Sequence, residues 1–254
     1  MNWDAWIPLM VVASSLLPGF VIFGLAEKRV RLRTALNLAG ALLKLALVAW
    51  MLWGVYHEHH FETRLPFLPG LELVLRAGPL SLLFVTLSTG LWLVTTVYAI
   101  GYLEGSPHRS RFFGFFSLCV TATVGVALAG NLITFLLFYE LLTLSTYPLL
   151  VHRGTEMARR AGQTYLKYTV FGGALLLLGT VWLYTLTGTL EFTARGFVAG
   201  VGEEHRLALI IIFTLLIAGL GVKAALVPLH GWLPQAMVAP APVSALLHAV
   251  AVVK

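Results

Sequence analysis

The sequence predicts an all-α, polytopic transmembrane helical bundle. Hydrophobic residues make up 59% of the 254 residues and charged residues only 11%, whereas a soluble domain usually carries about 25% charged residues. The apolar residues lie in runs of roughly 18 to 25, the length that a helix needs to cross about 30 Å of hydrocarbon. These runs are continuous and do not alternate with polar residues as the strands of a membrane β-barrel do.

Seven candidate spans and the beginning of an eighth follow one another along the chain. Their approximate ranges are 5–26, 34–54, 79–103, 112–130, 132–151, 163–186 and 207–228, and the eighth begins near 240. From Pro240 to Lys254 there are about 15 residues, fewer than the roughly 20 that a crossing helix needs. We therefore expect the chain to be a piece of a longer protein, cut inside its eighth helix.

Basic residues occur mainly in the loops that follow the odd-numbered spans. They are Lys28, Arg29, Arg31 and Arg33 after span one, Arg109 and Arg111 after span three, and Arg153, Arg159 and Arg160 after span five. Short cytoplasmic loops carry an excess of lysine and arginine. The bias predicts that the N-terminus lies outside the cell, and it explains the net charge of +6 without a nucleic-acid partner.

The remaining composition excludes several other classes of protein. The single cysteine, Cys119, lies in an apolar run, so neither a disulfide nor a thiolate metal site can form within the chain. The opening stretch "MNWDAWIPLM" has no basic residue, which argues against a cleaved signal peptide. No Walker loop, dinucleotide fingerprint or iron–sulfur cysteine cluster is present. We therefore expect no cofactor, no electron transfer by this chain and no quinone bound to it.

Five ionisable residues fall well inside the expected spans, where a charge costs about 2.5–3.5 kcal/mol even on the mildest insertion scale. They are Lys44, Glu140, Lys167, Lys223 and His248, and Lys254 would be a sixth if the eighth helix continues. Such residues normally face a partner or a water-filled cavity. The sequence offers no partner for Lys44, and a helix–helix contact is an equal alternative to a role in transport.

Glu140 lies near the middle of span five. Thr143 and Tyr147 follow three and seven residues later, so all three share one helical face. Nothing nearby on its own helix neutralises Glu140, which indicates a cation on another helix. The alternative is a protonated carboxyl group that hydrogen-bonds to a neighbouring helix.

Lys223 lies in the apolar run "LIAGLGVKAALV", five residues before Pro228. A proline removes a backbone donor and clashes with the preceding turn, and freed carbonyl groups at membrane depth are tolerated only inside protein or beside water. The sequence therefore predicts a discontinuous span seven in which Lys223 is buried beside a wet cavity. In the alternative, Pro228 merely ends the span and Lys223 reaches the cytoplasmic interface.

Three further residues are each open to two interpretations. Lys167 lies about one turn inside span six, where it either acts in transport or extends to the interface. His230 follows the break, where bracing of the broken segment is favoured over proton transfer. His248, six residues before Lys254, can pass a proton between its two ring nitrogens or hydrogen-bond between helices.

The stretch "GVKAALVPLHGWLPQAMVAPAPVSALLHAVAVVK" resembles the antiporter-like membrane subunits shared by respiratory complex I, membrane-bound hydrogenases and Mrp-type cation/proton antiporters. The family places a lysine before a P-L-H-x-W-L-P segment and then a P-x-P-V-S-A-L-L-H helix. "FYELL" places Glu140 at the helix-five glutamate of the family, and "YLKYTVFGG" places Lys167 at its helix-six lysine. Within the family, "FYELLTLSTYPLLVH" looks most like the D-type subunit of the Mrp antiporters.

The resemblance implies an organisation in two inverted repeats. Residues 1–110 would form three N-terminal helices, and 111–254 would form the first repeat, incomplete at its C-terminus. The helix break and its loop would include Pro228, His230 and Pro234, with Gln235 where the family usually carries Asp.

The function that the resemblance implies is that of a proton-translocating subunit of a multisubunit sodium/proton antiporter in a prokaryotic cell (inner) membrane. Its partners would be other membrane subunits, protons and sodium. Glu140 and Lys223 would form a coupled pair, Lys167 would modulate Lys223, and His248 and Lys254 would serve the onward proton path. The alternatives are a proton-pumping subunit of an NADH–quinone oxidoreductase or hydrogenase, and a structural membrane module without conduction.

Overall fold

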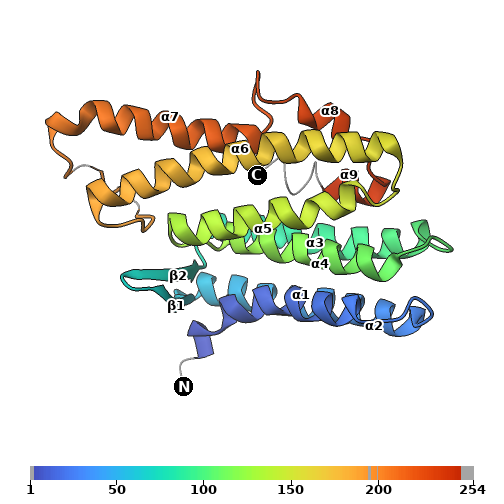
Figure 1. The fold of residues 1–254 in the computed structure, drawn as a ribbon. Helices are drawn as coiled ribbons and strands as arrows, with labels where there is room; N and C mark the ends of the chain where they lie inside the picture. Colours follow the sequence, from blue (N-terminus) through green and yellow to red (C-terminus); the bar gives the residue numbers. More distant parts are fainter. Residues whose placement is uncertain (1–2, 194–195, 199, 247–254) are drawn as a thin grey trace.

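The described residues form a bundle of long helices with a β-hairpin at one end (Figure 1). The computed structural model describes residues 3–193, 196–198 and 200–246. The long helices are α1 (Ile7–Phe23), α2 (Val30–Tyr56), α3 (Pro79–Tyr102), α4 (Arg109–Ala127), α5 (Leu132–Leu150), α6 (Glu156–Thr187) and α7 (Arg206–Lys223). The shorter elements are β1 (Glu62–Leu68), β2 (Leu71–Arg76), α8 (Trp232–Ala236), α9 (Ala241–Leu246) and the 3-10 turns Trp3–Ala5 and Glu203–His205.

Each of the seven expected spans corresponds to one long helix. Helices α2 to α7 are long and apolar enough to cross a membrane, and α1 is a shorter apolar helix. The 17 residues of α1 lie at the lower end of the range that spans a bilayer. The predicted polytopic helical architecture is confirmed. The expected eighth span begins as α9, and its continuation, with His248 and Lys254, lies outside the described residues.

Consecutive helices are neighbours in space along most of the bundle. Helix α1 packs on α2 and α4, α2 on α3, α4 on α5, α5 on α6 and α6 on α7. Helix α8 packs on α6, and α9 packs on α3, so the C-terminal segment returns to the first half of the bundle (Figure 1). The end of α7, which precedes this segment, contacts α5 through Lys223, and the candidate site lies there.

Capping side chains determine where several helices begin. Asn131 and Thr155 accept hydrogen bonds from N–H groups in the first turns of α5 and α6. At the start of α4, the carboxylate of Glu27 accepts from the N–H groups of Arg109 and Ser110 at 3.1 and 3.0 Å. These bonds satisfy donors that a helix N-terminus leaves open. The negative charge of Glu27 also suits the positive end of the helix dipole.

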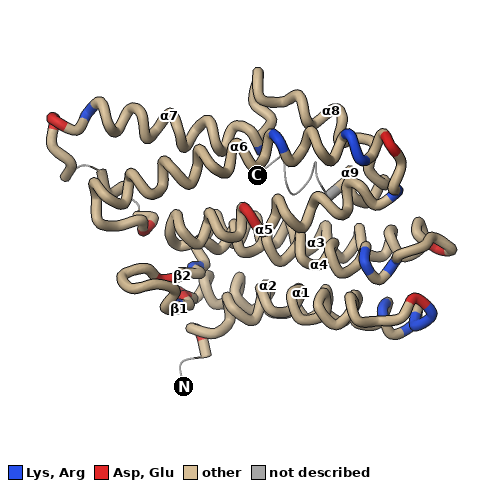
Figure 2. Tube along the Cα trace, in the orientation of Figure 1, with Lys and Arg blue, Asp and Glu red and all other residues tan. Residues whose placement is uncertain are grey.

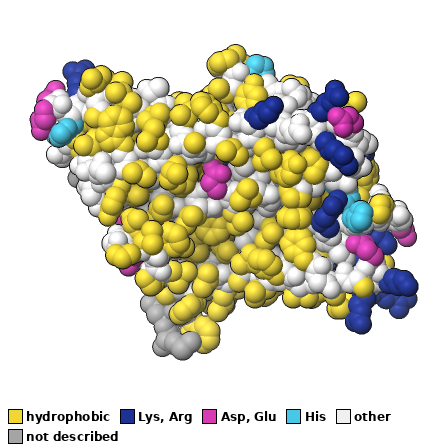
Figure 3. All heavy atoms as spheres, in the orientation of Figure 1, with side chains coloured by type: hydrophobic (Ala, Val, Ile, Leu, Met, Phe, Trp, Pro, Cys, Tyr) yellow, Lys and Arg dark blue, Asp and Glu magenta, His cyan; other side chains and the backbone are white. Residues whose placement is uncertain are grey.

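Most charged side chains gather at the ends of the bundle, and mainly apolar side chains, interrupted by an acidic group near the middle, cover the helix shafts between them (Figure 3). The loops that follow α1, α3 and α5 lie at the same end, where Figure 2 shows most of the basic segments. A shared basic end is what the positive-inside pattern requires of consecutive odd-numbered loops. Which end faces the cytoplasm stays a prediction.

The connection between α2 and α3 contains a β-hairpin, which the all-α prediction missed. The two strands pair antiparallel, from Glu62 opposite Arg76 to Leu68 opposite Leu71. Gly70 takes φ +79 at the turn, a conformation that glycine adopts at no steric cost. A Pro-Gly dipeptide between two runs that alternate in character is a turn signal, so the sequence did contain a cue for this hairpin.

Ion pairs attach the hairpin to the segment that follows α6. Arg64 lies 2.6 Å from Glu62, 3.1 Å from Glu72 and 2.7 Å from Glu191, and Arg76 lies 3.2 Å from Glu191. Hydrogen bonds from Arg64, the largest cause, and from Arg76 lower the pKa of Glu191. Burial raises the pKa of Glu62, but hydrogen bonds from Arg76 and Arg64 outweigh that effect and lower it overall.

Acidification is expected to loosen this attachment. A carboxyl group whose pKa is lower in the folded state stabilises the fold above its unfolded value, near 4.5, and this stabilisation is lost as the pH falls through the folded value. Because the pairs are partly exposed, each contributes only about 0.2–1 kcal/mol. Hydrogen exchange of the hairpin amides, corrected for intrinsic rates, should therefore stay constant from neutral pH down to the unfolded pKa near 4.5 and should rise at lower pH.

The matched variants are Glu191→Gln and Glu104→Gln. Glu191→Gln is expected to weaken protection of the hairpin at neutral pH and to reduce its acid dependence. Glu104, an exposed carboxylate in the loop after α3, lies outside the network, so Glu104→Gln should leave both unchanged. Equal acid dependence in the two variants would contradict the assignment of the network.

Candidate functional site

Lys223 is the last residue of α7, and its side chain turns into the bundle rather than toward an interface. Its exposed fraction is 5%. The ammonium Nζ donates to the backbone carbonyl of Tyr139 at 2.6 Å and to the hydroxyl of Thr143 at 2.8 Å. It also lies 3.7 Å from the centroid of the Tyr139 ring. Hydrogen bonds from charged groups contribute about 1.5–3 kcal/mol each. The interfacial alternative for this side chain is therefore wrong.

Helix α7 ends at Lys223 because the backbone forms a C-terminal turn there. The N–H of Leu226 bonds to the carbonyl of Gly221 at 2.9 Å, and the N–H of Ala225 bonds to the carbonyl of Val222 at 3.2 Å. These two bonds form the Schellman pattern. Ala225 takes the left-handed conformation with φ +52, which costs roughly 1–2 kcal/mol for a residue with a side chain.

The sequence prediction assigned the break to Pro228, and this is corrected, because the helix has ended before that proline is reached. The expected span 207–228 contains α7 and the first part of a non-helical segment at 224–231, and the short helix α8 follows that segment. Trp232 is buried and donates its indole N–H to the carbonyl of Val222 at 2.7 Å, which satisfies a carbonyl at the end of α7. Span seven is therefore discontinuous. Pro228, His230 and Pro234 are exposed.

Glycines allow α6 and α7 to approach each other closely beside Lys223. A Cβ atom on Gly172 would lie 2.8 Å from Cβ of Val222, and one on Gly219 would lie 2.7 Å from the carbonyl oxygen of Gly172. The hydroxyl of Tyr139 donates to the carbonyl of Gly219 at 2.9 Å. Small residues permit such close helix packing in membranes. They hold the end of α7 against both α5 and α6.

Glu140 follows Tyr139 on α5, and its carboxyl group lies against α6. A Cβ atom on Gly173 would overlap Oε1 of Glu140, so a glycine at this position leaves room for the carboxyl group. Oε1 is buried and has no hydrogen-bond partner among the described residues. Figure 2 shows the acidic position near the middle of α5. An oxygen in this environment is available to a proton, a water molecule or a cation.

Glu140 and Lys223 are neighbours without a direct ion pair between them in the described part of the chain. Lys223 binds α5 through Tyr139, which directly precedes Glu140, and through Thr143, which lies about one turn after it. The coupled role that the sequence motifs gave to this pair stays a prediction, and the geometry places both groups at one level of the bundle.

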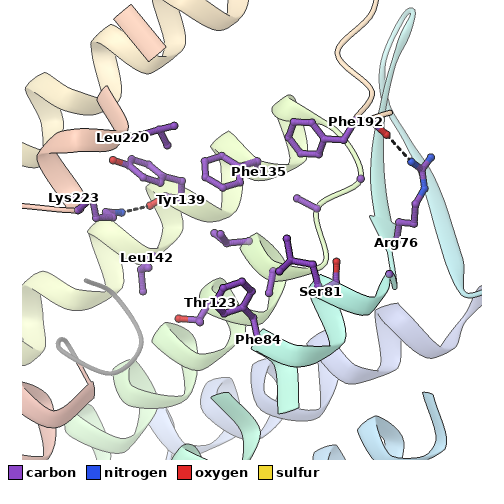
Figure 4. Close-up of a pocket in the computed structure, with 17 residues that line it drawn as sticks. Arg76, Ser81, Phe84, Thr123, Phe135, Tyr139, Leu142, Phe192, Leu220 and Lys223 are labelled. Atoms are coloured by element: carbon purple, nitrogen blue, oxygen red, sulfur yellow. Dashed lines mark hydrogen bonds between the residues drawn. The ribbon is translucent and has the colours of Figure 1, made fainter. Parts of the chain in front are cut away.

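A cavity of about 610 Å³ reaches Lys223 from the end of the bundle that carries the hairpin (Figure 4). Side chains of α3, α4, α5 and α7 line it. Figure 4 shows Lys223 and Tyr139 at one end of the cavity and Arg76 and Phe192 at the other. A liquid water molecule occupies about 30 Å³, so this volume suffices for a file of water. The cavity expected beside Lys223 is present, and its filling by water stays a prediction.

Reasoning from the sequence missed a polar cluster that continues from the lysine toward α4. Tyr165 is buried on α6, lies beside Thr143 and Thr146 of α5, and packs edge-on against Trp232 with ring centroids 5.3 Å apart. The thiol of Cys119 lies 3.6 Å from the hydroxyl of Thr146. The run of hydroxyl residues "TLST" in span five was the available signal.

Among the residues that the structure describes, the other predicted site residues do not gather around the lysine at the end of α7. Lys167 is exposed on α6, where Tyr165 and Thr169 of the same helix are buried. His230 is exposed in the non-helical segment after α7. His248 and Lys254 lie outside the described residues, so the roles predicted for them stay predictions.

Known families account for most of the chain. Residues 129–254 match the family described as NADH:quinone oxidoreductase/Mrp antiporter, transmembrane, and residues 70–113 match the one described as NADH-ubiquinone oxidoreductase (complex I), chain 5 N-terminus. The chain belongs to this family of antiporter-like membrane subunits. The family expected from the sequence motifs is thereby confirmed.

Two bacterial relatives illustrate where the antiporter-like chain fits. It is 38% identical over 187 residues to the A1-type subunit of the Na⁺/H⁺ antiporter of Staphylococcus haemolyticus, covering 73% of this chain and 23% of the relative. It is 36% identical over 200 residues to the A-type subunit of the Na⁺/H⁺ antiporter of Alkalihalophilus pseudofirmus, covering 76% and 24%. The chain thus spans about a quarter of the length of these relatives. Both relatives are of the A type, whereas the sequence motifs favoured the D type.

Two solved structures share the fold of the antiporter-like chain. A chain of the membrane-bound sulfane sulfur reductase, an archaeal respiratory membrane complex, superposes with a TM-score of 0.85 at 21% identity, covering 97% of this chain and 51% of that one. A chain of the Mrp complex from Dietzia sp. superposes with a TM-score of 0.82 at 22% identity, covering 99% and 47%. At these identities the likeness establishes the fold alone.

Proposed function

We propose that the chain is the part of a multisubunit monovalent cation/proton antiporter that translocates protons, with sodium as the cation. The burial of Lys223 at the end of α7, held by two oxygens of α5, is the observation that carries this proposal. Relatives that are named Na⁺/H⁺ antiporter subunits support it. The proposed setting is a prokaryotic cell membrane, and the proposed partners are other membrane subunits of the same complex.

Lys223 is the proposed proton-exchanging group. In the ammonium state it donates to the carbonyl of Tyr139 and to Thr143. A hydroxyl group both donates and accepts hydrogen bonds, so Thr143 can turn to donate to the neutral amine after the proton has left. The cavity supplies a route for that proton toward the hairpin end of the bundle.

Glu140 is the proposed electrostatic partner of Lys223. A nearby negative charge favours a bound proton on the amine, and its removal to a greater distance favours release. The glycines of α6 and the break after α7 are the elements whose movement would change that distance. Lys167, His248 and Lys254 keep their predicted roles in modulation and onward transfer as part of this proposal.

A proton-pumping subunit of an NADH–quinone oxidoreductase is the second candidate, because the descriptions of both matching families include that enzyme. The two candidates differ in what drives the protons. We expect vesicles that contain the full-length protein and its partner subunits to acidify or alkalinise on an imposed sodium gradient without any electron donor. Proton movement that requires NADH and quinone, and ignores sodium, would favour the second candidate.

The orientation proposed from the basic loops places the N-terminus outside and the loop after α5 in the cytoplasm. A cysteine in place of Glu156, which is exposed at the start of α6, should react with a membrane-impermeant thiol reagent only from the cytoplasmic face. A cysteine in place of Glu204, exposed before α7, should react only from outside. Labelling of the two positions from the opposite faces would reverse the assignment.

A further inference from the structure

A second buried lysine lies in the first half of the bundle, apart from the site around Lys223. Lys44 is in α2, and its exposed fraction is 0%. Its Nζ donates to the hydroxyl of Ser15 on α1 at 2.6 Å and lies 5.0 Å from the centroid of the Trp92 ring on α3. A buried ionisable group inside a membrane is costly and marks a functional site by default.

Hydroxyl and amide side chains continue from Lys44 toward the basic end of the bundle. Ser15 shares a hydrogen bond with Thr121 of α4 at 2.8 Å, and the Thr121 hydroxyl donates to the carbonyl of Ser117 at 2.9 Å. The hydroxyl of Ser117 lies 3.5 Å from Oδ1 of Asn37 on α2. All of these side chains are buried.

The same sequence of contacts reaches the loop that follows α1. Asn37 donates to the carbonyl of Arg33 at 3.1 Å, and the buried guanidinium of Arg33 donates to the hydroxyl of Ser110 at 2.9 Å. Arg33 also lies 3.7 Å from the carboxylate of Glu27, which is about half exposed. This connected set of side chains is called the polar track below. Its members are Lys44, Ser15, Thr121, Ser117, Asn37, Arg33, Ser110 and Glu27.

The track residues lie where α1, α2 and α4 pack together. Close approach of the backbones supports this, because a Cβ atom on Gly19 of α1 would lie 3.1 Å from Cβ of Ser117, and one on Gly40 of α2 would lie 2.8 Å from the carbonyl of Ser14. Intervals of four and seven residues place side chains on one helical face. The track residues at these intervals are Arg33, Asn37 and Lys44 on α2, and Ser110, Ser117 and Thr121 on α4.

Several polar groups of α3 beside Trp92 have no hydrogen-bond partner in the described part of the chain. Thr89 and Thr96 lie about one turn before and after Trp92, on the same helical face. Their hydroxyl groups and the indole N–H of Trp92 are buried and have no hydrogen-bond partner among the described residues. Buried polar groups are nearly always satisfied by protein or by ordered water. Water at this position would lie beside Trp92, whose ring centroid is 5.0 Å from Nζ of Lys44.

We propose that Lys44 is a second proton-exchange site, reached by water along the polar track from the basic end of the bundle. In the release step one N–H bond of the ammonium group breaks, the electron pair stays on Nζ, and the proton passes to a water molecule and then to Glu27 or bulk solvent. Ser15 and Thr121 then turn so that a hydroxyl donates to the neutral amine. Uptake is the reverse of these steps.

The helices packed against Lys44 carry few other ionisable groups. Helix α1 carries none, and α3 carries two tyrosines near its basic end. Helix α4 carries Arg109 and Arg111 at its start, and its Cys119 contacts α5. On α2 itself, Arg33 belongs to the track, and Arg31 and Tyr56 lie near the two ends of the helix. Glu27 is thus the carboxylate that a proton leaving along the track would meet first. The proposal concerns the first four helices and does not rest on the role of Glu140 or Lys223.

Hydration of the track can be tested in the full-length protein by thiol labelling. Ser117→Cys places a thiol in the track, and the native Cys119, two residues away on the opposite side of the same helix, is the matched control. A small water-soluble methanethiosulfonate reagent, added from the side of the basic loops, should label position 117 more than about tenfold faster than Cys119, because reaction needs a hydrated thiolate. Labelling of position 117 as slow as that of Cys119 would overturn the proposal.

Transport by Lys44 variants provides the second arm. Lys44→Met removes the proton-exchanging group, whereas Lys44→Arg keeps a charge that cannot be released. Both are expected to lose most of the proton flux of vesicles containing the full-length complex, while Lys28→Met, in the exposed loop, keeps it. Full flux in Lys44→Met, or rescue by Lys44→Arg alone, would reduce Lys44 to a structural role. If the Lys44 variants fail to assemble, the labelling of position 117 decides the question.

Discussion

Replacing Lys223 with arginine is expected to abolish proton-coupled transport while the protein still inserts and assembles. The guanidinium group can donate to the same Tyr139 carbonyl and Thr143 hydroxyl that now bind the ammonium group. Arginine, however, stays protonated at every accessible pH, so it can hold the site but cannot release a proton. Cation-dependent proton flux in vesicles with the full-length complex should fall to the level of Lys223→Ala.

The exposed loop lysine Lys28 is the matched control for this substitution. Lys28→Arg makes the same chemical change outside the bundle and should leave the flux unchanged. Transport near the wild-type level in Lys223→Arg would mean that a fixed positive charge suffices at the end of α7. In that case the hydrogen bonds to α5 serve only to stabilise the helix break.

Glu140→Gln is expected to cause a loss of similar size. Glutamine keeps the length and hydrogen-bonding capacity of the side chain but removes its charge, and the space beside Gly173 accommodates either group. Without the carboxylate, the proton affinity of Lys223 no longer depends on how far α5 lies from α7. Sodium-driven proton flux in vesicles should therefore disappear, with normal amounts of assembled complex.

Two further variants separate charge from position. Gly173→Ala keeps Glu140 but places a Cβ atom where Oε1 now lies, so it should displace the carboxyl group and reduce transport. Glu156→Gln removes an exposed carboxylate at the start of α6 and should have no effect. Wild-type rates in Glu140→Gln would show that the carboxyl group is structural.

The helical bundle was predictable from the sequence because the hydrocarbon core imposes one simple requirement, a run of about 20 apolar residues in each span. The spans between them also made it predictable that the basic loops after α1, α3 and α5 lie at one end of the bundle. The hairpin at Glu62–Arg76 was missed because the prediction followed hydropathy and passed over the Pro-Gly turn signal, and its attachment to the bundle depends on contacts between distant residues, such as Arg64 and Glu191. Hydropathy carries no information about such contacts.

Within the site, the sequence indicated which residues are unusual but not how they meet. Lys223 and Glu140 stood out because a charge in a span is expensive. The position of the break was misjudged because Pro228 is a visible helix breaker, whereas the turn at Ala225 depends on backbone bonds to Gly221 and Val222. Tyr165 gave no signal, because a tyrosine in a membrane helix is common and its partners lie on other helices.

The partners of Lys44 in the polar track could not be predicted from the sequence either. Lys44 was recognised as a buried charge, but no partner could be named, because Ser15 and Thr121 come from two other helices, α1 and α4, whose packing against α2 the sequence does not show. Serine and threonine are frequent in membrane helices, so their pattern becomes informative only when the packing brings three helices together at Gly19 and Gly40.

The most direct test of the account is the protonation state of the Lys223 side chain in the assembled complex. Nitrogen-15 NMR of labelled lysine side chains distinguishes ammonium from amine, and the Lys223 signal is the one absent from Lys223→Arg. If Lys223 exchanges protons during transport, this signal should change between the ammonium and amine forms when the sodium gradient across the vesicles is reversed. A Lys223 signal that stays ammonium under both gradients, in vesicles that exchange sodium for protons at full rate, would contradict it.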